Sequence, residues 1–170
     1  VPIAWATGID RLIAIPAAGL ITLLAAMNHR FRLLPAIEDV GRSSYGTIAY
    51  GASITLLLLQ FWPQQPAAVA AGVLVMAVGD GLAGLLGPLV SSPCWLVWGQ
   101  RKSVVGTGAM AAGSLAMLLL VRQLAIAAGL PHPELPALLA ISATAVVLEQ
   151  LAVGGLDNFT VPLAAGWLWQ

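Results

Sequence analysis

The stretch AAVAAGVLVMAVGDGLAGLLGPLV, residues 67–90, decides the fold class because Asp80 is its only charged residue. A transmembrane helix needs about 20 predominantly apolar residues. Apolar and polar residues do not alternate along the stretch, and it is longer than a strand of a membrane barrel. It therefore predicts a membrane-spanning helix that carries one ionisable group.

Five further apolar runs accompany this one, separated by more polar connections. They cover residues 12–27, 47–62, 104–121, 135–153 and 159–169. Of the 170 residues, 59% are hydrophobic and 8% are charged, whereas about 25% of residues are charged in an average soluble domain. We therefore expect an all-α, polytopic transmembrane bundle of about six helices, formed as a single integral membrane domain over residues 1–170.

Charge and cysteine content exclude several classes of function. Seven Lys and Arg residues balance seven Asp and Glu residues, so no basic surface is available to bind nucleic acid. A single cysteine, Cys94, excludes a disulfide framework and a multi-cysteine metal site. The chain begins with Val1 rather than Met, which leaves open whether a native N-terminal segment precedes it.

The connections between the runs predict which ends of the bundle lie together. With six spans, residues 28–46, 91–103 and 154–158 fall on one side, and residues 63–66 and 129–136 on the other. Five of the seven basic residues belong to the first group. Cytoplasmic loops carry the excess of Lys and Arg, so we expect the first group to be cytoplasmic.

Three carboxylates are predicted to meet on that side. At a rise of ~1.5 Å per residue, Asp80 and Glu149 each lie ~20 Å along their runs, and Asp157 follows the fifth run. Ionisable groups at membrane depth are costly and mark functional sites. Oxygen ligands of this kind suit Mg²⁺, which takes one or two carboxylates together with substrate phosphates. The structural alternative is that these acids pair with Arg or Lys, or cap a helix.

The connection before the fourth run has the composition of an anion site. It places Arg101 and Lys102 beside Ser103, Gly106 and Thr107 at the expected start of a helix. The N–H groups and dipole at a helix N-terminus attract anions. The connection therefore predicts a polyphosphate cradle, although it does not follow the Walker A order. The alternative is an ordinary cytoplasmic Arg-Lys pair followed by small packing residues.

Four short segments between residues 41 and 165 carry a family resemblance. They are Gly41-Arg42-Ser43-Ser44-Tyr45-Gly46 with Tyr50, Gly79-Asp80-Gly81-Leu82-Ala83 with Gly87, Lys102-Ser103-Val104-Val105-Gly106-Thr107, and Glu149 with Asp157-Asn158-Phe159-Thr160-Val161-Pro162. In order and spacing this set resembles the membrane kinases of isoprenoid alcohols, which include dolichol kinase, phytol kinase and their bacterial relatives. The phytol kinase branch is the most similar.

The resemblance implies transfer of the terminal phosphate of a nucleoside triphosphate, typically CTP, to a prenyl alcohol such as phytol, geranylgeraniol or farnesol. By matching position, the family's nucleotide and metal roles fall on Asp80, Lys102, Ser103, Gly106, Glu149, Asp157 and Asn158. Many relatives also carry an Arg-Lys-x-x-His motif in an earlier helix. Either the corresponding helix was lost with the native N-terminus, or this branch lacks it.

Our hypothesis from the sequence combines these observations. Asp80 and Asp157 hold Mg²⁺ with support from Asn158. Lys102, Ser103 and the amides near Gly106 hold the phosphates, with Arg101 and Thr107 beside them. Glu149 either completes the metal shell or accepts the proton of the alcohol.

Two other functions stay open at this point. A phospholipid cytidylyltransferase would use the same CTP, Mg²⁺ and membrane acceptor, although its usual His-Gly-Gly and Asp-Arg signature is absent here. A small ion-coupled transporter would also bury acids in glycine-rich helices, although no inverted repeat is visible. The identity of the alcohol and the choice of CTP over other nucleotides are not readable from the residues.

Overall fold

The computed structural model describes residues 2–31 and 45–170. The expected contribution of Gly41 to Ser44 therefore lies outside the described residues. The elements follow one another in this order: α1 (Pro2–Thr7), α2 (Arg11–Phe31), α3 (Gly46–Phe61), α4 (Pro66–Leu74), the π-helical segment η2 (Val75–Asp80), α5 (Gly81–Leu89), β1 (Cys94–Val97), β2 (Gln100–Ser103), α6 (Val104–Ala127), α7 (Leu135–Leu151) and α8 (Asp157–Leu168).

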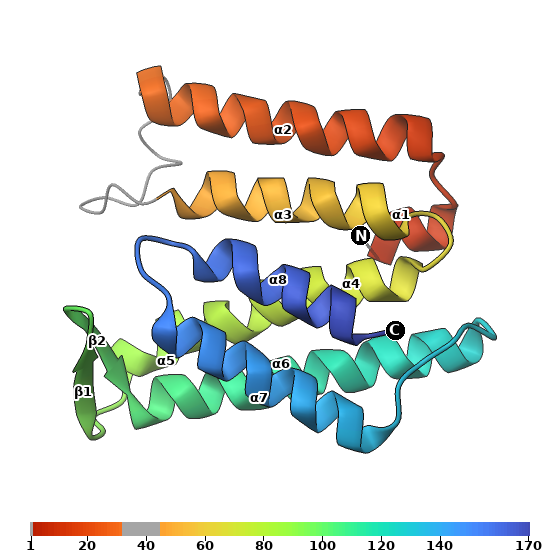
Figure 1. Ribbon diagram of the computed structural model, residues 1–170. Coiled ribbons are helices and arrows are strands. Elements are labelled where there is room, and N and C mark those ends of the chain that lie inside the picture. The colour runs from red at the N-terminus through yellow and green to blue at the C-terminus, as the bar shows by residue number, and fades with distance from the viewer. Residues whose placement is uncertain (1, 32–44) are drawn as a thin grey trace.

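The all-α class is confirmed, and each of the six predicted apolar runs is helical (Figure 1). Residues 67–90 correspond to α4, η2 and α5, which form one 24-residue apolar helix from Pro66 to Leu89. Within the described residues, α2 and α6 are also long and apolar enough to cross a membrane. Helices α3 and α7 are apolar but shorter.

A two-stranded hairpin precedes α6, which the sequence analysis did not predict. Strands β1 and β2 pair antiparallel, with Trp95 opposite Lys102. Trp98 and Gly99 form the turn and both have positive φ, 50° and 78°. Two such residues in succession are the geometry of a tight hairpin turn. The hairpin therefore fixes the position of Lys102 relative to the helices.

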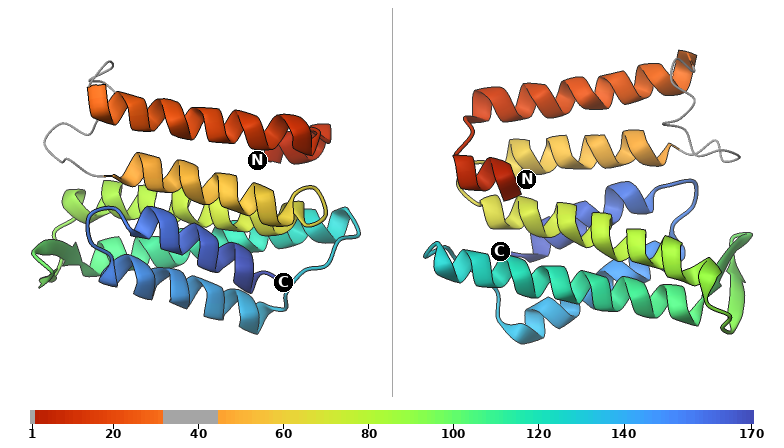
Figure 2. Two further views of the ribbon diagram at one scale, coloured as in Figure 1. Left: turned by 45° about the horizontal axis from the view of Figure 1, so that its top comes forward. Right: turned by 180° about the vertical axis from the view of Figure 1, so that it is seen from behind.

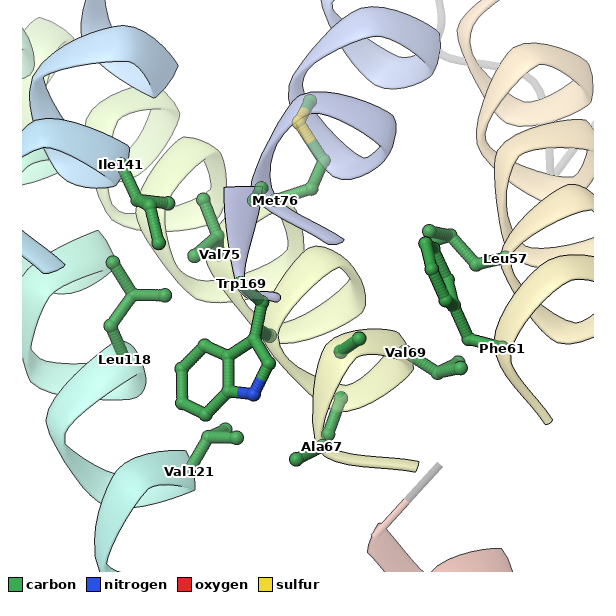
Figure 3. Close-up of a cluster of buried hydrophobic side chains, with 14 of the residues drawn as sticks. Leu57, Phe61, Ala67, Val69, Val75, Met76, Leu118, Val121, Ile141 and Trp169 are labelled. Atoms are coloured by element: carbon green, nitrogen blue, oxygen red, sulfur yellow. The ribbon is translucent and has the colours of Figure 1, made fainter. Parts of the chain in front are cut away.

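Helix α4 lies at the centre of the hydrophobic core. Residues Ala67 to Ala71 of α4 are at most 3% exposed. Figure 3 shows Val69 of α4 and Val75 of η2 between side chains of neighbouring elements, with Trp169 near Val121 of α6. The core thus holds the helices of the bundle in fixed positions relative to one another.

Small residues let the long helices approach closely. A Cβ atom at Gly79 would lie 2.5 Å from Ser114 Oγ, and one at Gly106 would lie 3.5 Å from Gly87 Cα. Interfaces between membrane helices are rich in small residues for this reason. These glycines let η2 and α5 pack directly against α6.

Helix α2 lies at the edge of the bundle and packs against α3. Its apolar side chains are largely exposed; Leu12 is 82% and Ile21 is 65% exposed. A soluble protein rarely leaves so contiguous an apolar surface in water. The exposure is that expected of a helix in contact with lipid.

The predicted grouping of connections is confirmed where the structure describes them. The hairpin and the α7–α8 connection lie at one end of the bundle (Figures 1 and 2). The α3–α4 turn and the α6–α7 loop lie at the other end. We call the first the hairpin end; Asp80 and Glu149 lie on the halves of their helices nearer to it.

Candidate active site

A cavity of about 650 Å³ opens at the hairpin end. Its wall combines α5, the hairpin, the start of α6, the end of α7 and the first residue of α8. Eight predicted site residues line it: Asp80, Arg101, Lys102, Ser103, Gly106, Thr107, Glu149 and Asp157. The predicted convergence of distant segments on one place is therefore observed.

Asp80 is the last residue of the π-helical segment that interrupts the apolar helix. Such wide turns in α-helices are rare and often occur at functional sites. Within the described residues its carboxylate forms no hydrogen bond or ion pair, although Asp157, Glu149 and Lys102 all act on it electrostatically. Asp80 thus offers the cavity a carboxylate that protein donors do not occupy.

Asp157 begins α8 and lies in its first turn, where the helix dipole favours a negative charge. Its Oδ1 accepts hydrogen bonds from the backbone N–H of Asn158 at 3.0 Å and from Asn158 Nδ2 at 3.3 Å. Asn158 does not line the cavity. Its observed contact is with Asp157, which agrees with a supporting position behind that carboxylate.

Lys102 and Glu149 form an ion pair at 2.5 Å across the cavity wall. The ammonium group also donates to the carbonyl oxygen of Glu149 at 2.9 Å. The two side chains are 11% and 9% exposed. For Glu149 the structural alternative stated above is therefore observed, since this acid pairs with the lysine.

The backbone amides at the start of α6 are already occupied. Those of Val104, Val105 and Gly106 donate to Pro93 O, Ser92 Oγ and Ser103 Oγ respectively. Ser103 is the N-cap of the helix, a role that satisfies N–H groups left unpaired at a helix start. These three amides are not available as a phosphate cradle in this arrangement, so cationic side chains remain as the anion-binding groups.

The sequence analysis did not identify Gln150, nor the residues on and beside the hairpin that line the cavity. Gln150 lines the cavity and donates through Nε2 to Glu149 Oε2 at 2.8 Å and to Thr107 Oγ1 at 2.9 Å. Ser92, Cys94 and Gln100 also face the cavity. A glutamine next to an intramembrane acid is itself an unusual polar residue in an apolar run, and that signal could have identified Gln150.

The donor set fits a magnesium ion held by two acids rather than three. Among residues 2–31 and 45–170, no three Asp, Glu, His or Cys side chains form a group that could hold a metal ion. Both carboxylate oxygens of Glu149 are engaged by Lys102 and Gln150. Asp80 and Asp157 retain free acceptor capacity, and Mg²⁺ is commonly bound by one or two carboxylates with phosphates and water.

The fold and this cavity define a class: a helical, membrane-type protein with a polar site of mixed charge at one end of its bundle. No family model matches the chain, and no solved structure matches it. A phytol kinase of Synechocystis sp. is 36% identical over 98% of this chain and 74% of the relative. The chain belongs to the phytol and polyprenol kinase family.

Proposed function

We propose that this protein is an integral membrane kinase that phosphorylates an isoprenoid alcohol of the phytol type. Its family membership makes it a phosphotransferase with an alcohol acceptor. The observation that carries the proposal is one cavity in which Asp80, whose carboxylate accepts no hydrogen bond from the described residues, lies with Asp157 and Lys102. Phosphoryl transfer depends on positioning and charge neutralisation more than on covalent chemistry, and this set of charges supplies both.

The donor in this proposal is a nucleoside triphosphate, with CTP first among the candidates, and the metal is Mg²⁺. Asp80 and Asp157 are the residues that would hold the ion. Bound there, Mg²⁺ would neutralise charge on the β- and γ-phosphates. Lys102 and Arg101 place positive charge at the same cavity. The hydroxyl of Thr107 adds a neutral polar group on the first turn of α6.

The prenyl alcohol would approach along the apolar side of the cavity. Pro88, Leu89 and Val90 of the α5 end form part of the wall, and Leu89 is 71% exposed. A prenyl chain could therefore lie against α5 in the lipid while its hydroxyl enters the polar part of the cavity. The alcohol oxygen would then form a bond to the γ-phosphorus as the bond from that phosphorus to the β–γ bridging oxygen breaks. The nucleoside diphosphate would leave, and the hydroxyl proton would pass to a phosphate oxygen or to water.

The nucleotide would reach the cavity from the cytoplasm in this account. Arg101 and Lys102 belong to the hairpin end, and positive residues favour the cytoplasmic side. The exposed apolar helices support a multi-pass arrangement in the bilayer. A soluble donor and a lipid acceptor could then meet at the membrane surface.

Labelled CTP tests the reaction type. Purified protein in lipid nanodiscs would receive phytol with either γ-³²P or α-³²P CTP in the presence of Mg²⁺. We expect the γ-label in the lipid fraction, with CDP as the other product. Label from the α-position in lipid, with release of pyrophosphate, would instead identify a cytidylyltransferase.

A panel of substrates tests the finer assignments. CTP, ATP, GTP and UTP would each be combined with phytol, geranylgeraniol, farnesol and dolichol, with the phosphorylated lipid as readout. We expect CTP with a phytol-length alcohol to give the highest kcat/KM. A clear preference for another nucleotide would overturn the donor assignment and leave the kinase reaction intact.

A further inference from the structure

Four polar side chains form a continuous chain of contacts along one wall of the cavity. Lys102 Nζ donates to Glu149 Oε1, Gln150 Nε2 donates to Glu149 Oε2 at 2.8 Å, and the same Nε2 donates to Thr107 Oγ1 at 2.9 Å. The chain joins β2, the last turn of α7 and the first turn of α6. Glu149 is its centre, and the residue is only 7% exposed.

Both carboxylate oxygens of Glu149 are engaged by these contacts. Each carboxylate oxygen receives one donor from the protein, and its backbone carbonyl receives the ammonium group of Lys102 as well. A metal ligand or a general base must present a free lone pair to the ion or to the proton it removes. In this arrangement each oxygen of Glu149 already accepts from a donor of the protein, and the side chain is only 9% exposed.

Lys102 gains a defined position from the same contacts. A free lysine side chain samples many rotamers, and Lys102 stands on a strand of four residues. The carboxylate and the carbonyl near the C-terminus of α7 take two of its three N–H donors. The helix dipole favours a cation there. Its third N–H donor has no acceptor among residues 2–31 and 45–170 and could serve a ligand.

We propose that Glu149 and Gln150 are positioning residues that hold Lys102 and Thr107 in the cavity, and that Glu149 is neither a metal ligand nor the base. The inference rests on the proposed kinase function for its kinetic consequences. Its structural content, the restraint of Lys102, is independent of the reaction. Gln150 fixes the second oxygen of the carboxylate, so that the first oxygen faces the lysine.

Chemical labelling of Lys102 tests the restraint without any assay of activity. Lys102 is the only lysine of the chain, so a peptide-level mass spectrum reports its reaction with an amine reagent unambiguously. We expect slow labelling in the unsubstituted protein and labelling at least tenfold faster in Glu149→Gln and Gln150→Leu. Gln123→Leu, an exposed site on α6, is the matched control and should leave the rate unchanged. Equal rates in all four proteins would overturn the proposal.

Kinetics separate positioning from metal binding. Loss of a group that orients a functional residue typically costs about 10–100-fold. We expect Glu149→Gln to lower kcat/KM for the nucleotide by such a factor while the Mg²⁺ concentration for half-maximal rate stays constant. Asp80→Asn should raise that Mg²⁺ concentration. A matching rise in Glu149→Gln would identify Glu149 as a metal ligand and overturn the proposal.

A double-mutant cycle tests whether Glu149 acts through Lys102. Residues that share one interaction give non-additive effects. We expect Lys102→Gln/Glu149→Gln to be no slower than Lys102→Gln alone, whereas additive losses would show an independent role for Glu149. If the unsubstituted protein transferred no phosphate to any alcohol, the proposed function would fail, and the labelling result would still decide the positioning role.

Discussion

At the residue scale, Lys102 is the cation that connects the parts of the site. It is largely buried, it is paired with Glu149, and it lines the same cavity as Asp80 and Asp157. A fixed cation whose side chain is largely buried acts more strongly on a developing negative charge than one in water. Removal of the Lys102 charge should therefore lower the rate of phosphoryl transfer more than removal of any exposed arginine of the chain.

Replacement of Lys102 by alanine should reduce phosphoryl transfer by about 100-fold or more, the usual effect of removing one charge-stabilising group. The protein should remain folded in detergent, as judged by circular dichroism and gel filtration. Arg122→Ala is the control, since Arg122 contacts Pro133 and Glu134 at the opposite end of the bundle. Normal turnover by Lys102→Ala would remove this residue from the site.

The convergence of Asp80, Lys102 and Asp157 could be predicted from the sequence, because helix rise and connection parity fix depth and side. The pairing of Glu149 with Lys102 could not be predicted from the sequence. Lys102 and Glu149 are 47 positions apart in the chain, and a pattern of residue types does not show which of several nearby charges will pair. The occupied amides at the start of α6 were also unpredictable, since their acceptors, among them Pro93 and Ser92, lie on a connection with no regular pattern.

At the element scale, glycine contacts between helices set the architecture. Gly72 lies on buried α4, where a Cβ atom would collide with the carbonyl oxygen of Pro162 on α8 and lie 2.8 Å from Leu57 Cδ1. Backbone atoms cannot move aside as a flexible side chain can. The crossing of α4 and α8 therefore depends on the absence of a side chain at this position.

Gly72→Ala should lower the free energy of unfolding by about 1–3 kcal/mol, the usual cost of overpacking a core. Gly81→Ala is the matched control, because a Cβ atom there meets no atom within 4 Å. Since alanine favours helix by about 1 kcal/mol over glycine, this control should be neutral or slightly stabilising. Thermal unfolding in detergent measures both variants, and equal stability for the two would contradict the packing argument.

The helix boundaries followed closely from hydropathy, and the predicted run 104–121 is the first part of α6 (Val104–Ala127). The hairpin was missed because each strand has four residues, too few to give a periodic signal. The π-helical segment was also missed. Its extra residue per turn depends on how α4 and α5 each dock against their neighbours, which apolar composition does not encode.

At the scale of the whole molecule, the exposed apolar surface of α2 and the polar hairpin end give the bundle two distinct environments. The grouping of connections by end could be predicted from the number and length of the apolar runs. The number of helices that cross the bilayer could not be predicted in the same way, because α3, α7 and α8 are shorter than a full span. Short helices can still cross where the bilayer thins or where they tilt in a bundle.

Labelling of cysteine should locate the hairpin end. Cys94 is exposed and is the only cysteine of the chain. A membrane-impermeant maleimide should label it in inverted vesicles of an expression host and not in intact spheroplasts. In a Cys94→Ser background, His132→Cys should show the reverse, because this residue belongs to the α6–α7 loop at the other end of the bundle. Labelling of Cys94 from outside would place the site on the other face of the membrane.

The most direct test of the whole account is the single-turnover transfer of γ-³²P from CTP to phytol by Asp80→Asn, compared with the unsubstituted protein in the same nanodiscs. Among the described residues none donates a hydrogen bond to the carboxylate of Asp80, and its replacement by asparagine changes charge with little change in size. We predict a rate at least 100-fold lower, with an unchanged circular dichroism spectrum. A folded Asp80→Asn protein that transfers the label at the normal rate would contradict the assignment of this cavity as the active site.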